Sequence, residues 1–139
     1  MKTHLFRFVL ALLVAGAAGR LVAAPALVGH ACFQGQSLDA DAIKAALLGR
    51  KVTIGDTRVL IVIVKASDAQ DQFLQQYVGM NTSQFQNHWR RLFMTGGGSA
   101  PKIVESEAEA SRLVAETTGA LAIVEHAQAG RLVVLAAGK

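Results

Sequence analysis

The sequence is poor in the residues that build covalent, metal and cofactor sites. It has one cysteine, Cys32, two prolines and one tryptophan among 139 residues. A single thiol excludes an intramolecular disulfide. The histidines beyond the N-terminal segment, His30, His88 and His126, are far apart and lack the spacing of zinc ligands. We therefore expect no metal site and no cofactor.

Cys32 itself leaves two interpretations open. A small buried thiol is the ordinary state of a free cysteine. In an oxidising compartment, the same residue could form a disulfide with another chain. A catalytic role together with His30 would need a third group to orient the histidine, and the sequence offers none nearby.

The glycine-rich stretch at 96–99 does not contain a known catalytic or phosphate-binding motif. A P-loop requires Gly-x-x-x-x-Gly-Lys-Ser/Thr, and here no lysine precedes Ser99. A serine-hydrolase elbow requires Gly-x-Ser-x-Gly, but Pro101 stands where the second glycine should be. The stretch also follows a predicted helix and not a strand. We expect that the chain is not an enzyme.

The N-terminal segment has the composition of an export signal. Basic residues precede an uncharged run at 8–19, which Arg20 closes. This run is shorter than the roughly 20 residues needed to cross a bilayer, but it suits a signal peptide. We expect residues 1–25 to be a signal peptide, with an uncleaved anchor as the alternative. The mature protein is then periplasmic or secreted.

Loss of the signal changes the charge of the chain. The full sequence has 14 Lys and Arg against 10 Asp and Glu, and its pI of about 9.6 would by itself favour nucleic-acid binding. Lys2, Arg7 and Arg20 leave with the signal, so 11 basic residues remain against 10 acidic ones, a net charge of +1. We therefore expect no nucleic-acid partner, and no membrane span after cleavage.

Residues 26–139 alternate apolar runs with amphipathic segments. About 115 residues suffice for one domain with its own core, but not for two. The continuous apolar run VLIVIV predicts a central strand buried on both faces. Strands are predicted at 26–28 with an extension to 33, at 51–54 and 58–64 around a turn at 55–56, at 120–124 and at 131–136; helices are predicted at 38–48, 68–78, 82–93 and from 107 onward. The pattern indicates a single α/β domain.

Polar residues mark where the predicted helices begin. Ser37 precedes the first helix and Ser67 the second. Ser106 and Glu109 have the S-x-x-E spacing of a capping box at the start of the fourth. The third is capped by Asn81 or Thr82, and the glycines expected to end helices are Gly49, Gly79 and Gly119.

The third predicted helix carries aromatic and basic residues together, a combination that also occurs in nucleic-acid-binding helices. Phe85, Trp89 and Leu92 are spaced i, i+4, i+7 and form one apolar stripe, while Arg90 and Arg91 lie off it. Base stacking would require an exposed indole. The periodicity instead predicts that Trp89 is buried in the core.

Several segments occur in an order that is typical of one protein family. They are Leu47–Lys51 (LLGRK), Ser67 with Phe73 six residues later, His88-Trp89, Phe93–Gly96 followed by Pro101, and Thr118–Val124. This order resembles the phosphate-binding proteins of ABC importers, and in particular their small, one-lobed exported members. The resemblance covers about residues 37–125. It implies one lobe of the type 2 periplasmic-binding-protein fold, with a central mixed sheet flanked by about four helices. The glycine run would then be the exit from the tryptophan helix toward Pro101 and the next strand.

The resemblance also implies a site at the start of the second helix. Full-length family members hold phosphate between two lobes, at a Ser-Gly-Thr helix N-terminus, where amide groups and the helix dipole favour an oxyanion. By position, Ser67 matches the serine, Asp68 replaces the glycine and Ala69 the threonine, while Lys65 is the nearest cation. A carboxylate at Asp68 competes with a bound anion for the positive end of the helix. Phosphate or another small oxyanion is therefore expected to bind weakly or not at all.

The sequence thus favours an exported, non-catalytic binding or accessory domain related to phosphate transporter substrate-binding proteins. The alternative is a structural or protein-interaction protein of the cell envelope, in which the former ligand face docks a partner protein. Titration with phosphate and sulfate, together with pull-down from an envelope extract, separates these two functions.

Export makes a direct prediction about the N-terminus. N-terminal sequencing of protein recovered from the envelope should begin between Ala24 and Val28, because small residues at 23–26 offer cleavage sites. Recovery of chains that still begin at Met1 in the membrane fraction would identify an uncleaved anchor instead.

Overall fold

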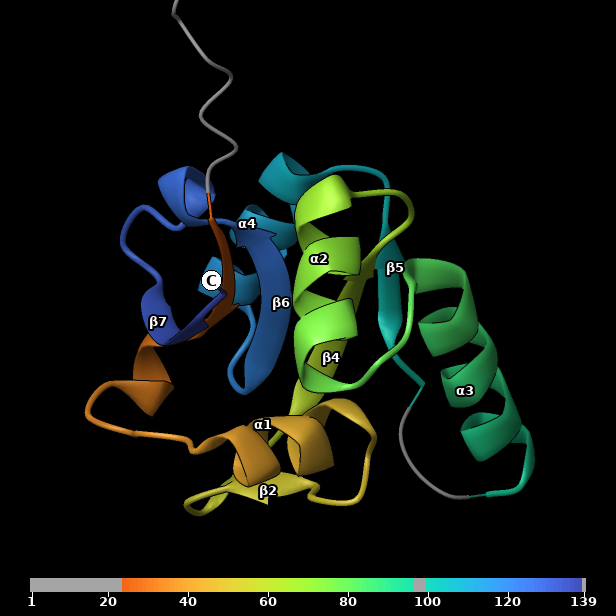
Figure 1. The fold of residues 1–139 in the computed structure, drawn as a ribbon. Coiled ribbons are helices and arrows are strands. Elements are labelled where there is room, and N and C mark those ends of the chain that lie inside the picture. Colours follow the sequence, from red (N-terminus) through yellow and green to blue (C-terminus); the bar gives the residue numbers. More distant parts are fainter. Residues whose placement is uncertain (1–23, 97–99, 139) are drawn as a thin grey trace, which may run out of the picture.

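A five-stranded mixed sheet forms the centre of the molecule, with helices on both of its faces (Figure 1). The computed structural model describes residues 24–96 and 100–138. The elements in chain order are β1 (Pro25–Gly29), a 3₁₀ turn η1 (Ala31–Phe33), α1 (Ala40–Leu47), β2 (Thr53–Ile54), β3 (Thr57–Arg58), β4 (Leu60–Val64), α2 (Asp68–Tyr77), α3 (Thr82–Met94), β5 (Lys102–Val104), α4 (Glu107–Glu116), β6 (Ala120–Glu125), a second 3₁₀ turn η2 (His126–Gln128) and β7 (Val133–Ala137). The expected α/β class, the single domain and the mixed sheet with four α-helices are confirmed.

The sheet has the strand order β5-β4-β6-β1-β7. β4 is parallel to both β5 and β6, whereas β1 is antiparallel to both β6 and β7. The predicted hairpin around the turn at 55–56 exists as β2 and β3, but these two strands form a separate small sheet. Five of the six VLIVIV residues form β4 in the interior of the large sheet, as expected, but Val59 lies outside it, so the strand predicted at 58–64 is divided between β3 and β4.

The two faces of the large sheet carry side chains of different size. Successive residues of a strand point to opposite faces, so odd and even positions separate. The face toward α1, α2 and α3 is built from large aliphatic residues, namely Leu27, Ile61, Ile63, Leu121 and Ile123. The face toward α4 is built from small ones, namely Ala26, Val28, Val62, Val64, Ala120, Ala122 and Val124. Ala110 and Val114 of α4 pack on this second face.

The first predicted helix begins later than its pattern suggested. α1 starts at Ala40, and its N-cap is Asp39, whose Oδ1 accepts a hydrogen bond from the Ala42 amide at 2.7 Å. The expected cap, Ser37, lies in the irregular segment before the helix. A carboxylate at the N-cap also interacts favourably with the helix dipole, which explains why the later start prevails.

The first predicted strand ends earlier than expected, and this exposes Cys32. β1 stops at Gly29, where an added Cβ would lie 2.9 Å from the ring of Phe33. Glycine therefore lets the chain turn back at once into η1, which buries Phe33. The cysteine is left at the surface, so the expectation of a buried thiol is wrong. The last strand also differs, because it begins at Val133 and not at residue 131.

The starts of the other helices agree with the sequence, but α4 ends at Glu116, before the expected Gly119. Ser67 caps α2, and Asn81 caps α3 through a capping box with Gln84. Ser106 caps α4, but the Glu109 carboxylate reaches back to the Glu105 amide and not to that of the cap residue. β5 follows Pro101 as predicted, whereas residues 97–99 of the expected glycine exit lie outside the described residues.

β1 limits where an export signal can end. Residues 1–23 of the expected signal peptide are outside the described residues, but β1 lies between β6 and β7 and all five of its residues are buried. The Ala24 carbonyl also accepts a hydrogen bond from the His126 amide at 2.9 Å. If the expected signal is cleaved, a mature chain that keeps β1 intact begins no later than Pro25, which favours the early end of the expected range from Ala24 to Val28.

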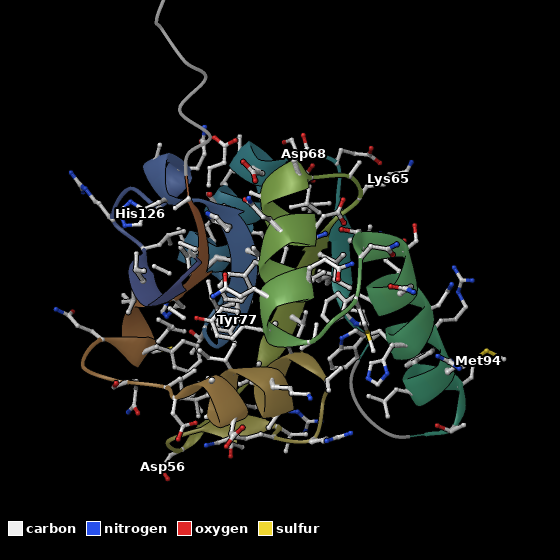
Figure 2. All side chains as sticks on the ribbon, in the orientation of Figure 1. Asp56, Lys65, Asp68, Tyr77, Met94 and His126 are labelled. Atoms are coloured by element: carbon white, nitrogen blue, oxygen red, sulfur yellow. The ribbon has the colours of Figure 1, made fainter. Side chains whose placement is uncertain are left out.

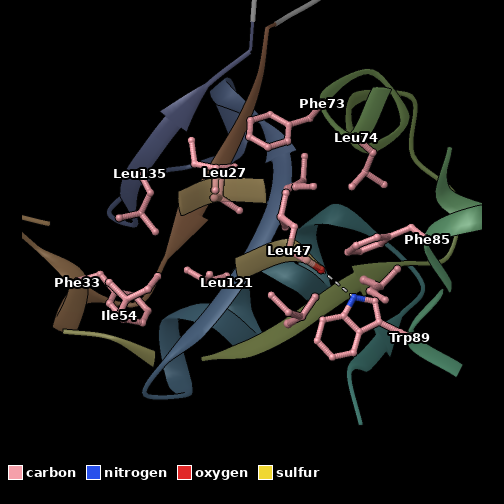
Figure 3. Close-up of a cluster of buried hydrophobic side chains, with 14 residues drawn as sticks. Leu27, Phe33, Leu47, Ile54, Phe73, Leu74, Phe85, Trp89, Leu121 and Leu135 are labelled. Carbon is pink, nitrogen blue, oxygen red and sulfur yellow. Dashed lines mark hydrogen bonds between the residues drawn. The ribbon is translucent and has the colours of Figure 1, made fainter. Parts of the chain in front are cut away.

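Trp89 lies in the larger of the two cores, as its periodicity predicted. Its side chain is 6% exposed, and its ring meets Phe85 edge to face. The indole Nε1–H donates to the Leu47 carbonyl at 3.0 Å, which fastens α3 to the end of α1 (Figure 3).

Replacement of Trp89 should strongly destabilise the domain. Trp89→Ala should lower the free energy of unfolding by about 3–5 kcal/mol, because it leaves a cavity and an unpaired Leu47 carbonyl. Urea unfolding followed by circular dichroism measures the loss. Phe93→Ala on the same helix is the matched control, since Phe93 is 55% exposed and should change stability by about 0.5 kcal/mol or less. Equal losses in the two variants would contradict a buried, structural Trp89.

Candidate functional site

The expected site lies where the parallel strands β4, β5 and β6 end. Their carboxyl ends meet at one edge of the sheet (Figure 1). β4 continues into α2 on one face, and its neighbour β5 continues into α4 on the opposite face. A reversal of this kind between neighbouring strands is where open α/β sheets place their ligands. We call this edge, with residues 65–69, 105–107 and 125, the strand-end site.

Two of the four candidate residues are exposed at the strand-end site. Lys65 directly follows β4, and its Nζ lies 3.8 Å from an oxygen of Glu105. Both of these side chains are largely exposed, so the ion pair contributes little to stability. Asp68 is the first residue of α2 and is also exposed. The two residues lie at the same end of the molecule (Figure 2).

The side chains of the other two candidate residues make contacts within the protein and do not face solvent freely. The Ser67 Oγ accepts from the Gln70 amide at 3.2 Å and thereby caps α2. The methyl group of Ala69 is buried, so only its backbone could face a ligand. The structure therefore brings the four residues together, but only Lys65 and Asp68 offer free side-chain surface, and their charges are opposite.

Glu107 completes the site and was not anticipated from the sequence. The Ser67 hydroxyl donates to Glu107 Oε1 at 2.9 Å, and the Glu125 amide donates to the same oxygen at 3.3 Å. A carboxylate from α4 thus takes contacts that a bound oxyanion would be expected to make, and charge-assisted hydrogen bonds of this kind are strong. No sequence pattern indicates this role, because one partner lies after β4 and the other is the last residue of β6.

Gln70 holds the same region open between β4 and β6. These strands pair from Leu60 to Val62 and then separate. Beyond that point, the Gln70 amide replaces the missing strand: its Oε1 accepts from the Val64 amide at 2.9 Å, and its Nε2 donates to the Val64 carbonyl at 2.8 Å. Nε2 also donates to Thr82 Oγ1 at 3.0 Å and so reaches the start of α3. Gln70 could have been found from the sequence, since it is a polar residue on the core-facing stripe of a helix.

The hollows around the strand-end site are rich in carboxylates. One of about 400 Å³ lies at the start of α2 and α3, and one of about 350 Å³ lies between the starts of α2 and α4. The Asp71 carboxylate in the first hollow accepts a hydrogen bond from the Thr82 amide at 2.7 Å. A side chain of α2 therefore satisfies the first amide of α3. The carboxylates that line the two hollows are Asp68, Asp71, Glu105, Glu107 and Glu125, against the single lysine Lys65. Their combined charge disfavours an anionic ligand.

Two further features bear on function. Within residues 24–96 and 100–138, no three His, Cys, Asp or Glu side chains are arranged to hold a metal ion. Over the same part of the chain, no helix has the length and apolar character needed to cross a membrane. Comparisons with protein-family models and with curated proteins found no match. The family resemblance therefore remains a prediction from the sequence.

Loss of the Gln70 amide should destabilise the domain. Gln70→Leu keeps the side-chain volume but leaves the buried Val64 N–H and C=O without partners, at about 1–3 kcal/mol for each orphaned group. We expect the free energy of unfolding to fall by about 2–4 kcal/mol. The measurement is urea unfolding followed by Trp89 fluorescence.

Gln72→Leu is the matched control for this change. Gln72 is exposed on the same helix, so its replacement should alter stability by about 0.5 kcal/mol or less. A Gln70→Leu variant as stable as this control would show that the amide is not needed to close the gap beside β4.

Proposed function

We propose that this chain is an exported, non-catalytic binding or accessory domain of the cell envelope, related to the substrate-binding proteins of phosphate importers, in which oxyanion binding is weak or lost. The observation that carries the proposal is the contact between Ser67 and Glu107. The start of α2 is where the resemblance implies an oxyanion site, and the protein's own carboxylate occupies the serine hydroxyl there.

The electrostatics support weak or lost binding. A phosphate at the start of α2 would have to displace Glu107 from Ser67 and lie near Asp68. Two unit charges about 4 Å apart repel by roughly 1–4 kcal/mol at surface-like dielectrics, which reduces affinity by about tenfold to a thousandfold. The single lobe also encloses a ligand from one side only. Phosphate should therefore bind more weakly than about 1 mM.

A non-catalytic role is supported by how the nucleophilic side chains are used. The Ser67 hydroxyl caps α2 and donates to a carboxylate, so it belongs to the structural network. Cys32 is exposed on η1, and the Nδ1 of its neighbour His30 accepts a hydrogen bond from the Cys32 amide at 3.0 Å. That ring nitrogen holds the turn in place and is not directed at a thiol.

The alternative function is a structural or protein-interaction protein that docks a partner on the strand-end site. The carboxylates that line its hollows favour this alternative, because an acidic surface complements and steers a basic partner. In either case the residues at the start of α2 no longer serve a tight phosphate site.

Neutralising the two carboxylates should restore measurable anion binding. Asp68→Asn with Glu107→Gln preserves side-chain shape and removes two negative charges, so phosphate affinity should rise at least about tenfold. Isothermal titration with phosphate and with sulfate measures the change. The matched control is Asp56→Asn with Glu116→Gln, which removes the same charge from exposed positions outside the strand-end site.

Two results would change the assignment. Micromolar phosphate binding by the unmodified protein would contradict weak or lost oxyanion binding. If neither double variant binds phosphate or sulfate in the titration, the start of α2 is not an anion site. The interaction-protein alternative would then be preferred.

A further inference from the structure

Two exposed large apolar side chains, Phe93 and Ile103, line one groove outside the strand-end site. Phe93 and Met94 end α3 and are 55% and 77% exposed, and Ile103 in the middle of β5 is 58% exposed. These are three of the five large hydrophobic side chains found exposed in the described residues. Met94 projects from the outer end of α3, away from the sheet (Figure 2). Exposed apolar clusters of this kind mark interaction surfaces.

A groove of about 220 Å³ lies between α3 and β5 at this cluster. Trp89 and Ile63 belong to the buried core, so they give the groove a fixed floor, while Phe93, Pro101 and Ile103 contribute its exposed wall. The volume is below the roughly 300 Å³ at which small-molecule pockets begin. It suits one large apolar side chain from a partner better than it suits a cofactor.

The backbone of β5 offers few groups for strand addition, although β5 is an edge strand. The Lys65 amide donates to the Val104 carbonyl, so the backbone groups that point outward belong to the alternate residue, Ile103. Pro101 has no N–H to offer, and the Glu105 N–H donates to Glu109 Oε2 at 3.1 Å. The edge is blunted in the way that prevents pairing with another strand. A partner must therefore bind through side chains in the groove.

The charge around the groove is of one sign. The sequence contains no Asp or Glu between Asp71 and Glu105, a stretch that includes all of α3 and β5. Arg90 lines the groove and forms no ion pair with another described residue, whereas Arg91 on α3 and Lys102 on β5 do not line it. An uncompensated cation beside an apolar groove attracts an acidic surface and repels a basic one.

We propose that the groove between α3 and β5 docks an acidic, amphipathic segment of a partner protein. A large apolar side chain of the partner enters between Phe93 and Ile103, and carboxylates beside it face Arg90. Arginine and aromatic residues are the types most enriched at protein–protein interfaces, and both are present here.

The same surface is less suited to a lipid bilayer. The apolar stripe of α3 faces the core through Phe85 and Trp89, so the helix cannot insert its hydrophobic side into a membrane. Binding of anionic lipid relies on clusters of roughly 4–8 basic residues, more than α3 and β5 supply. A concave groove with a fixed floor also matches an inserted side chain better than a flat surface.

The test uses a fluorescein-labelled model helical peptide with leucines at i, i+4 and i+7 and glutamates around them. Fluorescence anisotropy with the purified protein should show saturable binding near 100 µM or tighter, at least about tenfold tighter than a peptide with lysine in place of glutamate. A third peptide, with serine in place of leucine, should lose binding by a similar factor.

Variants of the protein locate the binding surface. Arg90→Glu should reverse the preference between the acidic and the basic peptide, and Ile103→Asp should weaken both at least tenfold. Val52→Asp is the matched control, since Val52 is an apolar residue of similar exposure, 52%, that precedes β2. Unchanged circular dichroism and thermal melting confirm that each variant is folded. Arg90 is exposed, so this variant remains informative even if Ile103→Asp does not fold.

Three outcomes would overturn the proposal. One is acidic-peptide binding that Arg90→Glu leaves unchanged, and another is the absence of saturable binding below about 1 mM. The third is that Arg90→Glu and Ile103→Asp leave peptide binding unchanged but abolish another interaction. That interaction would be self-association, measured by sedimentation, or binding to phosphatidylglycerol vesicles. That result would assign the groove to a second copy of the chain or to a lipid surface.

Discussion

The hydrogen bonds of a single amide, that of Gln70, determine how the end of the sheet is built. Val64 closes β4 where β6 has already turned away, so its N–H and C=O would be buried without partners. Gln70 satisfies both and also binds Thr82, which ties β4, α2 and α3 together. Because the amide stands in for a strand, β4 and β6 remain apart at their carboxyl ends. The strand-end site exists only because of that separation.

The separation has a second consequence, which is the position of Glu107. An open sheet edge exposes backbone donors, and the Glu125 amide is one that β4 would otherwise have accepted. The Glu107 carboxylate accepts it together with the Ser67 hydroxyl, so one acidic side chain joins the starts of α2 and α4 to β6. These contacts are made within the protein, so the end of the sheet is closed without a bound ligand.

Local patterns were sufficient for most of the fold but not for the site. The alternation of apolar runs and capping residues predicted the buried β4, the caps at Ser67 and Ser106, and a core position for Trp89, because each depends on neighbours within a few residues. Cys32 was misplaced because its exposure depends on Gly29, where close approach of the Phe33 ring ends the strand. Glu107 could not be predicted, since its partners are distant in sequence and meet only through the sheet topology.

The distribution of charge links the two surfaces. Carboxylates gather where β4, β5 and β6 end, whereas the stretch from residue 72 to residue 104 has none and carries Arg90, Arg91 and Lys102. Residues 26–139 are nearly neutral in sum, yet their charges are unevenly distributed, with carboxylates at the strand-end site and Arg90 at the groove beside α3. Screening confines each field to roughly 8 Å at physiological ionic strength, so charges farther apart than this affect each other little. The chain's net charge, taken alone, would have concealed both surfaces.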